Sequence, residues 1–177
     1  REIRRAQLGL DQPLHVRYVA WLGEAVHGNL GYSYTDYRPV TQKIAERLGP
    51  TMVLVLTAYL LAYVFGIVLG VIGALRPYSR TDFIVTFIGI MGVAMPGFYV
   101  GLILLYVFAL RVPLFPTGGM LTTGASFTVP DLLAHMALPV TALALFDLAS
   151  ITRYTRASML EVLDLDYVRT AHAKGLR

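Results

Sequence analysis

The sequence predicts an all-α fold, a multi-pass bundle of transmembrane helices. Of its 177 residues 56% are hydrophobic and only 15% are charged, and the mean hydropathy is +0.61. Soluble domains carry about 25% charged residues. Three long apolar runs lie in the chain, with basic residues beside them. One such run could be a buried helix of a large soluble protein, but three in a short chain indicate a membrane protein.

The N-terminal residues predict two short amphipathic helices joined by a turn. The first covers residues 13–28, with Pro13 in its first turn and Asp11 as a possible cap. The second covers residues 39–50 and ends at Gly49-Pro50. It either lies on the membrane surface or packs on neighbouring protein, and the sequence favours neither.

Three apolar runs are long enough to cross a bilayer core, which takes about 20 residues. They give predicted spans near residues 51–75, 83–110 and 132–152. The first carries no charge. The second exceeds the required length by a helical turn or more, so it must tilt, kink or break.

Glycine and proline interrupt these runs in ways that suit a transporter better than a simple anchor. We expect the second run to bend at Pro96-Gly97 and the third to kink at Pro139, and both places are candidate gating points. Two pairs of small residues have the spacing that lets helices approach closely, Gly66–Gly70 and Gly97–Gly101.

Asp147 is the only acidic residue deep in an apolar run. A charge in hydrocarbon costs a few kcal/mol or more, so this side chain should face protein or water. It either lines a polar pathway or forms a structural ion pair with an Arg on an adjacent helix. Its position about one turn before Arg153 also allows mere proximity to the membrane interface.

The chain ends in a charged segment rich in small residues, "DYVRTAHAKGLR". Val168, Ala171 and Gly175 are three to four residues apart and should share one helical face. Small residues there would let a partner approach the backbone, and Arg169 and Lys174 would be free to meet acidic groups. The alternative is a basic helix resting on anionic lipid, worth about 1 kcal/mol per Lys or Arg.

Lys and Arg in the loops predict the orientation. The connector 76–82 holds two Arg and the tail 153–177 holds five Lys or Arg, whereas loop 111–131 holds one. The connector and the tail should therefore be cytoplasmic. This gives an extracytoplasmic region at 1–50, although it is also basic, a transmembrane domain at 51–152, and a cytoplasmic loop at 153–177.

Several kinds of chemistry have no motif in the sequence. There is no Cys, which excludes disulfides and thiolate nucleophiles. There is no phosphate-binding loop, and the four His lack metal-ligand spacing. We therefore predict no catalytic residue, no metal site and no cofactor in this chain. Because the basic residues flank apolar runs, we predict no nucleic-acid partner.

The segment "SMLEVLDLDYVRTAHAKGL" strongly resembles the cytoplasmic loop of permease subunits of ABC importers, in the oligopeptide/dipeptide/nickel group. In that loop, a variant of the EAA motif, Arg169-Thr170-Ala171 takes the E-A-A slots and Gly175 the conserved glycine; the Glu itself is absent. The stretches "LGLDQPLHVRYVAWL", "GNLGYSY", "RPVTQKIAERLGPT", "MPGFYVG" and "RYTRASMLEVL" are also similar to this group. The resemblance covers nearly the whole chain.

The resemblance implies the type I ABC importer permease fold. It identifies the helix at the end of the chain as the coupling helix, which docks on the ATP-hydrolysing subunit. The residues it assigns to coupling are Asp166, Tyr167, Arg169, Thr170, Ala171, Lys174 and Gly175. The chain has no initiator Met and no secretory signal, so we expect an internal piece holding the second to fourth of six spans, with the second half of the loop missing.

By this resemblance the chain is a permease subunit in the cytoplasmic (inner) membrane of a bacterium. The expected partners are a second permease subunit, two ABC ATPase subunits that carry ATP and Mg, an extracytoplasmic substrate-binding protein, and membrane lipid. The expected cargo is di- or oligopeptide, with nickel or another small solute as the alternative. An ion-coupled secondary transporter fits less well. A membrane-embedded enzyme is disfavoured because His135 and Asp147 are more than three helical turns apart.

Overall fold

The computed structural model of the chain describes residues 12–175. It divides into two compact units, Arg1–Thr51 and Met52–Arg177, each of which is considered by itself. Between residues 12 and 175 the regular elements are all helices, and the only β pairing is an isolated bridge between Tyr32 and Pro39. The all-α fold class is therefore confirmed.

The first unit contains helix α2, Leu14–Val26, and the turn that follows it. Pro13 stands at the N-cap position with φ −55°, and its apolar ring accepts no capping hydrogen bond. Its place at the start of α2 agrees with proline's preference for helix starts. Asp11, the possible cap, lies outside the described residues. The predicted apolar face of α2 exists but is exposed; it comprises Leu14, Tyr18, Leu22 and Val26.

Polar contacts fix the turn that precedes the next helix. Lys43 Nζ lies 2.9 Å from Asp36 Oδ2, and Arg38 pairs with Glu46. The Ser33 hydroxyl and then the Lys43 ammonium lower the pKa of Asp36 to about 2. The turn is thus held to the first two turns of the helix that begins at residue 40.

Helix α3 runs without interruption over Val40–Leu75. The prediction that Gly49-Pro50 ends a separate surface helix is therefore wrong. Pro50 removes one backbone donor, but the usual clash of a proline ring with the Cβ of the preceding residue is absent because that residue is glycine. One lost hydrogen bond does not end a helix whose next 25 residues are apolar and gain by pairing their backbone groups internally.

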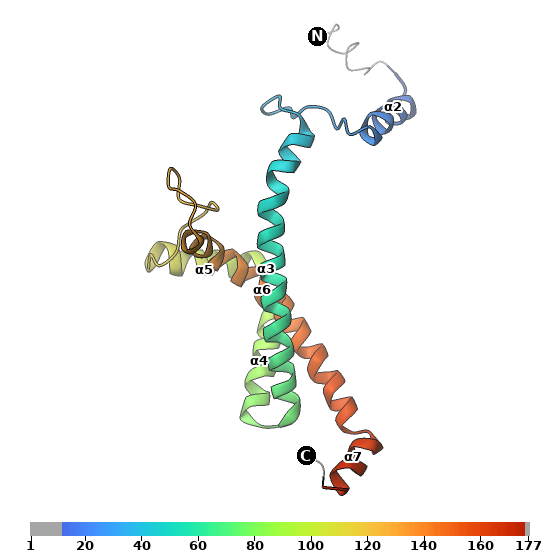
Figure 1. Ribbon diagram of the computed structural model, residues 1–177, viewed down its shortest axis with the longest axis vertical. Helices are drawn as coiled ribbons and strands as arrows, with labels where there is room; N and C mark the ends of the chain where they lie inside the picture. The colour runs from blue at the N-terminus through green and yellow to red at the C-terminus, as the bar shows by residue number, and fades with distance from the viewer. Residues whose placement is uncertain (1–11, 176–177) are drawn as a thin grey trace. The chain divides into compact units, whose positions relative to one another are not determined.

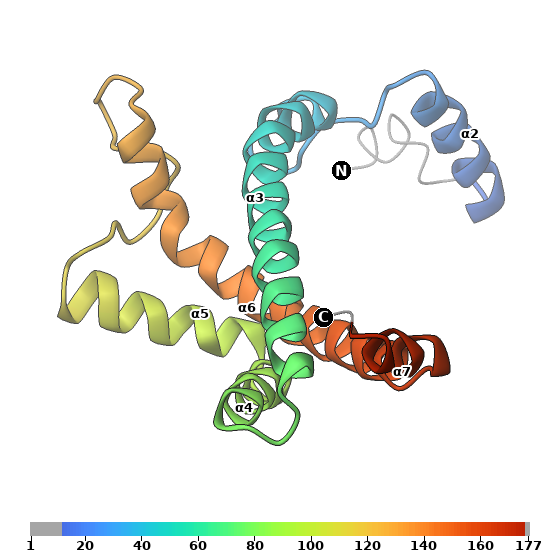
Figure 2. The ribbon, with the colours of Figure 1, turned by 60° about the horizontal axis from the view of Figure 1, so that its bottom comes forward.

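The second apolar run is divided into two helices with a sharp bend between them. α4 covers Arg80–Ala94 and α5 covers Gly97–Leu105, extended by a π-helical turn, η1, at Tyr106–Arg111. The angle between the two arms is 100°. Figure 2 shows the bend between α4 and α5. The break falls at the predicted Pro96-Gly97, because a residue before proline is driven out of the helical region. A role in gating remains a prediction.

Helix α6 covers Val129–Leu163 and is followed by the short helix α7, Asp166–Ala173. The Thr128 side chain caps α6 by accepting from the Asp131 N–H, and α6 continues through Pro139 as one helix. Within the described residues α3 and α6 are long and apolar enough to cross a membrane, and the bent pair of α4 with α5 and η1 would be a third span.

Small residues let α6 pack tightly against α3. A Cβ placed on Gly66 would lie 2.9 Å from Ile151 Cβ, and one on Gly70 would lie 2.6 Å from Thr155 Cβ. Ala58 and Ala62 continue the same line at four-residue spacing and are buried with Met136, Val140 and Ala144 of α6. The predicted close contact at Gly66–Gly70 is confirmed.

α6 also packs closely against α4. A Cβ on Gly92 would lie 2.7 Å from Ala149 Cβ, and Ala149 is 1% exposed. Gly97, by contrast, has no described atom within 4 Å of its Cβ position, whereas the Cβ position of Gly101 lies 3.8 Å from Ala142 Cβ. The contact predicted at Gly97–Gly101 therefore forms only at Gly101, at an ordinary van der Waals distance. Figure 1 shows α6 crossing α3 and continuing to α7.

Candidate functional site

Helix α7 presents most of its side chains to the outside. Two residues, Asp164 and Leu165, separate it from the end of α6. Val168 and Ala171 are its half-buried positions. The exposed residues of this segment, including most of those that the sequence assigned to coupling, are Asp166, Tyr167, Arg169, Thr170, Ala173, Lys174 and Gly175. The small Ala171 therefore faces inward, and the outer face of α7 is polar and aromatic.

The two basic residues of this segment differ in their contacts. An Arg169 guanidinium nitrogen donates to Asp164 Oδ1 at 2.5 Å, and a second lies 3.8 Å from Asp166 Oδ1. The expectation that Arg169 is free is wrong in this respect. Such an exposed pair contributes only about 0–1 kcal/mol, so a partner's acid could replace Asp164 at little cost. Lys174 forms no ion pair with any residue that the structure describes.

Gly175 lies beyond the end of α7, not on its face. The helix ends at Ala173, the Lys174 N–H donates to Thr170 O at 3.1 Å, and Gly175 has φ +81°. The prediction that Gly175 shares a face with Val168 and Ala171 is therefore wrong. A left-handed glycine just after a helix is a common way to end it, and no atom of residues 12–174 lies within 4 Å of its Cβ position.

A buried ion pair joins α4 to α6 two helical turns before α6 ends. Arg156 Nε donates to Asp82 Oδ1 at 2.5 Å, and an Arg156 terminal nitrogen donates to Asp82 Oδ2 at 2.8 Å. Asp82 is 4% exposed. A two-point contact between guanidinium and carboxylate fixes orientation as well as distance. It therefore sets the position of α6 relative to the start of α4.

The turn between α3 and α4 is built around the same carboxylate. The Ser79 hydroxyl accepts from the Asp82 N–H at 3.2 Å and caps α4, and the Tyr78 N–H donates to Asp82 Oδ2 at 2.9 Å. Tyr78 adopts φ +61°, which non-glycine residues rarely do. A Cβ on Gly73 of α3 would lie 3.3 Å from Val85 and 3.5 Å from Arg156 Cδ. Three helices thus meet at Asp82.

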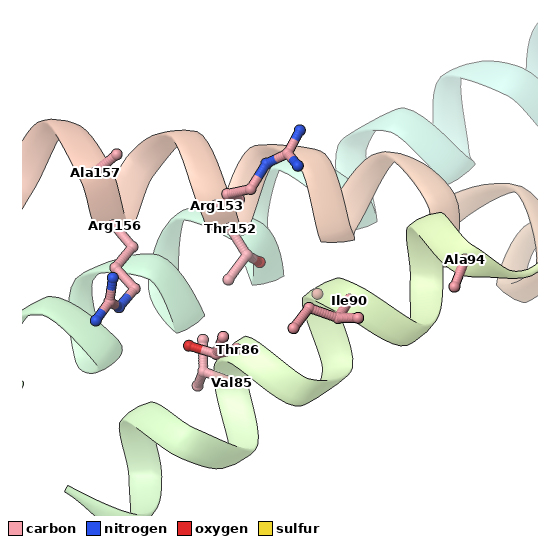
Figure 3. A pocket seen from close by; sticks show the side chains of 9 residues that line it. Val85, Thr86, Ile90, Ala94, Thr152, Arg153, Arg156 and Ala157 are labelled. Atoms are coloured by element: carbon pink, nitrogen blue, oxygen red, sulfur yellow. The ribbon is translucent and has the colours of Figure 1, made fainter. Parts of the chain in front are cut away.

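A groove of about 360 Å³ lies between α4 and α6 next to this ion pair. In Figure 3, Val85 and Thr86 of α4 point toward Thr152 of α6, while Arg153 points away from them. The walls are mostly apolar. Thr152 is 3% exposed, and its hydroxyl has no hydrogen-bond partner among the described residues.

The remaining predicted residues lie apart from α7. Asp147 is half-buried and forms no ion pair or hydrogen bond with described residues, so the expected Arg partner is not among them. Pro139 lines a second groove between α5 and α6, together with Gly101 and His135. Between residues 12 and 175, no three His, Asp or Glu side chains gather closely enough to hold a metal ion.

Comparison with known proteins bears on this arrangement. The family described as "binding-protein-dependent transport system inner membrane component" matches residues 66–177, which include α4, α6, α7 and the Asp82–Arg156 pair. The chain belongs to this family. It is thus part of a multi-pass inner membrane protein, and the resemblance to ABC importer permeases is confirmed.

Three relatives show the range of the similarity. The chain is 48% identical over 98% of its length to a putative peptide permease of Brucella ovis, and 44% identical over 96% to the oligopeptide transport system permease protein AppB of Bacillus subtilis. It is 37% identical over 99% to the glutathione transport system permease protein GsiC of Escherichia coli. The chain spans about half the length of these relatives, 54% in each case.

Proposed function

We propose that the chain is part of the permease subunit of an ATP-driven importer and that α7 is its coupling helix. One observation carries this proposal: a short helix with an exposed polar and aromatic face follows directly on α6, the longest apolar helix of the family-matched region. Force applied to such a helix reaches the membrane-spanning part without an intervening flexible segment.

The partners follow from this role. Two ABC ATPase subunits bind and hydrolyse ATP with Mg, and α7 of each permease docks on one of them. A second permease subunit completes the pathway, and an extracytoplasmic binding protein delivers the cargo, in keeping with the family's description. Transport proceeds by alternating access, with the ATPase pair moving α7 and the helices that carry it.

The exposed side chains of α7 suit a protein surface better than a lipid surface. A helix lying on lipid would direct its apolar residues toward the membrane. Here Val168 and Ala171 face the chain itself, and the exposed Tyr167 and Lys174 can stack on and pair with a partner. An acidic groove in the ATPase subunit would compete with Asp164 for Arg169 and bind Lys174 directly.

We propose di- and oligopeptides as the cargo. The named relatives are peptide, oligopeptide and glutathione permeases, and glutathione is itself a small peptide. Uptake of labelled di-, tri- and pentapeptides, glutathione and nickel by cells that carry the complete transporter would rank these cargoes. Uptake of nickel alone would contradict the proposal. Uptake that continues after ATP depletion would favour a secondary transporter.

Site-directed crosslinking tests the coupling role. The chain contains no Cys, so Ala173→Cys introduces a single thiol at the exposed end of α7 once any Cys elsewhere in the subunit has been replaced by Ser. We expect this thiol to crosslink to the ABC ATPase subunit in membranes, with a yield that changes when ATP is added.

A control and an opposite outcome complete the test. Ser158→Cys places a thiol at another exposed position, on α6, and should crosslink weakly and without dependence on nucleotide. If neither Ala173→Cys nor thiols at Tyr167 and Thr170 crosslink to the ATPase in a correctly inserted protein, α7 is not the docking helix and a lipid-facing role is the better interpretation.

A further inference from the structure

We propose that the Asp82–Arg156 ion pair is the connection through which a displacement of α7 reaches α4 and the bend at Met95-Pro96. The inference rests on the proposed coupling role of α7 and assigns two positioning residues to it. The polar partners of both residues in the structure lie in α4, α6 and the turn before α4.

The first step is the rigid continuity between α7 and Arg156. From Arg156 to Leu163 α6 is uninterrupted, about two turns or roughly 10 Å of helix. Only Asp164 and Leu165 separate the end of this stretch from α7. A displacement of α7 should therefore move Arg156 by a similar amount.

The second step is that Arg156 holds α4 by two contacts at its first turn. Both Asp82 oxygens accept from Arg156, so α4 can neither slide along α6 nor rotate about its own axis while the pair persists. The groove beside Thr86 and Thr152 leaves one side of this interface open (Figure 3), so the ion pair adds to the packing of α4 there.

The third step concerns the C-terminal end of α4, which precedes the bend. Gly92 packs on Ala149, so α4 is held to α6 near both of its ends. Two extended residues follow, Met95 with ψ 131° and Pro96 with ψ 133°. Since hinges are a few residues at the ends of elements, movement of the α4–α6 unit is taken up at this bend, which turns α5 relative to α4.

The test uses the complete transporter in proteoliposomes with the binding protein and both ATPase subunits. We measure peptide uptake and binding-protein-stimulated ATP hydrolysis for Asp82→Asn and Arg156→Lys. The matched control is Arg153→Gln. Arg153 is also an arginine and lies three positions before Arg156 on α6, but it is exposed and forms no ion pair with the described residues.

We expect both variants to hydrolyse ATP at close to the normal rate while uptake falls by about tenfold or more, within the usual range of coupling between sites. The control should leave both rates unchanged. The exchange Asp82→Arg with Arg156→Asp should recover part of the uptake, which a loss of folding would not allow. If Asp82→Asn does not accumulate, Arg156→Lys decides, since it keeps the charge and loses only the two-point contact.

Two outcomes would overturn the inference. Normal uptake in both variants would show that the pair transmits nothing, and a parallel loss of uptake and ATP hydrolysis that the exchange does not restore would make the pair merely structural. Either result leaves the Ala173→Cys crosslink to the ATPase intact. Loss of that crosslink in the unmodified background would instead contradict the proposed function.

Discussion

Arg156 and Asp82 are joined by two hydrogen bonds although 74 residues separate them in the sequence. The contact sits where α6 leaves the region it shares with α3 and α4. The Asp82 carboxylate also accepts from the Tyr78 N–H. The Asp82 side chain therefore stabilises the α3–α4 turn and also holds α6. The pair therefore has consequences for stability that are separate from any role in transport.

Removing one member of the pair should destabilise the subunit more than removing both. In Asp82→Ala the guanidinium of Arg156, whose side chain is 27% exposed, keeps its charge without a partner, and we expect a loss of about 2–3 kcal/mol in the free energy of unfolding. The double variant Asp82→Leu with Arg156→Met should recover most of that loss. Unfolding of the purified subunit in mixed micelles measures both, and equal losses in the two variants would contradict this account.

Close packing of α3 on α6 predicts a sharp sensitivity at Gly70. A methyl group there would lie 2.6 Å from Thr155 Cβ and 2.8 Å from the Thr152 carbonyl oxygen, which is backbone and cannot move aside. We expect Gly70→Ala to cost about 1–3 kcal/mol in unfolding free energy.

Gly23 provides the control for this substitution. It lies inside helix α2 with open space around its Cβ position, so Gly23→Ala should be neutral or stabilising by up to about 1 kcal/mol. Equal effects of the two substitutions, measured in the same micelle assay, would show that the α3–α6 contact is looser than described.

The apolar runs located the long helices correctly because length and hydropathy are local properties. Proline was a good guide at Pro96, where the residue before it is a methionine and the chain bends, and a poor one at Pro50, where it is a glycine and the helix continues. The preceding residue does not decide this by itself, because Pro139 follows a leucine and α6 still continues through it.

Length and hydropathy do not predict contacts between residues that are distant in the sequence. Asp82 and Arg156 looked like ordinary charges at the membrane interface. A signal was nevertheless present: Ala149, Thr152 and Arg156 are three and four residues apart, so an arginine shares a helical face with two small residues. Ala149 and Thr152 are buried in the structure, and Arg156 is half-buried. Which acid would meet the arginine could not be read from the sequence.

Substitutions at Gly175 separate backbone conformation from charge. An L residue at φ +81° is strained by about 1–2 kcal/mol, but asparagine tolerates this region better than most residues. If α7 docks on an ATPase, Gly175→Asp should uncouple uptake from ATP hydrolysis, whereas Gly175→Asn, nearly the same size and uncharged, should retain much of the uptake.

Gly175→Ala completes this series because it strains the backbone at this position without adding a polar side chain. Uptake and ATP hydrolysis are measured for all three variants at matched expression. Equal losses in Asp, Asn and Ala variants would mean that the glycine serves only to end the helix. Normal uptake in the Asp variant would contradict docking at this surface.

The unpaired hydroxyl of Thr152 predicts a substitution that improves stability. Valine has nearly the same shape as threonine and lacks the polar group, and a buried donor without a partner costs about 1–3 kcal/mol. Thr152→Val should raise the free energy of unfolding by about 1 kcal/mol. Thr141→Val is the control, because the Thr141 hydroxyl already donates to Ala137 O at 2.7 Å and removing it brings no such gain.

The bend between α4 and α5 should depend on Pro96 alone. Pro96 lacks the N–H that a continuous helix would use, and it drives Met95 into the extended region. Pro96→Ala removes both constraints, and the apolar residues on either side would then gain by closing the helix. Spin labels on Ile90→Cys and Leu102→Cys, both exposed, report the change because twelve residues of straight helix span about 18 Å.

We expect the distance between the two labels to increase in Pro96→Ala and approach that of a straight helix. Since the proposed movement of α4 is taken up at this bend, peptide uptake should fall while binding-protein-stimulated ATP hydrolysis continues. Gly97→Ala is the matched control, because its Cβ position is open and the proline remains, so both the label distance and uptake should stay near normal. A straightened helix that still transports peptide would show that the bend is dispensable, and an unchanged distance would show that tertiary packing, not proline, holds it.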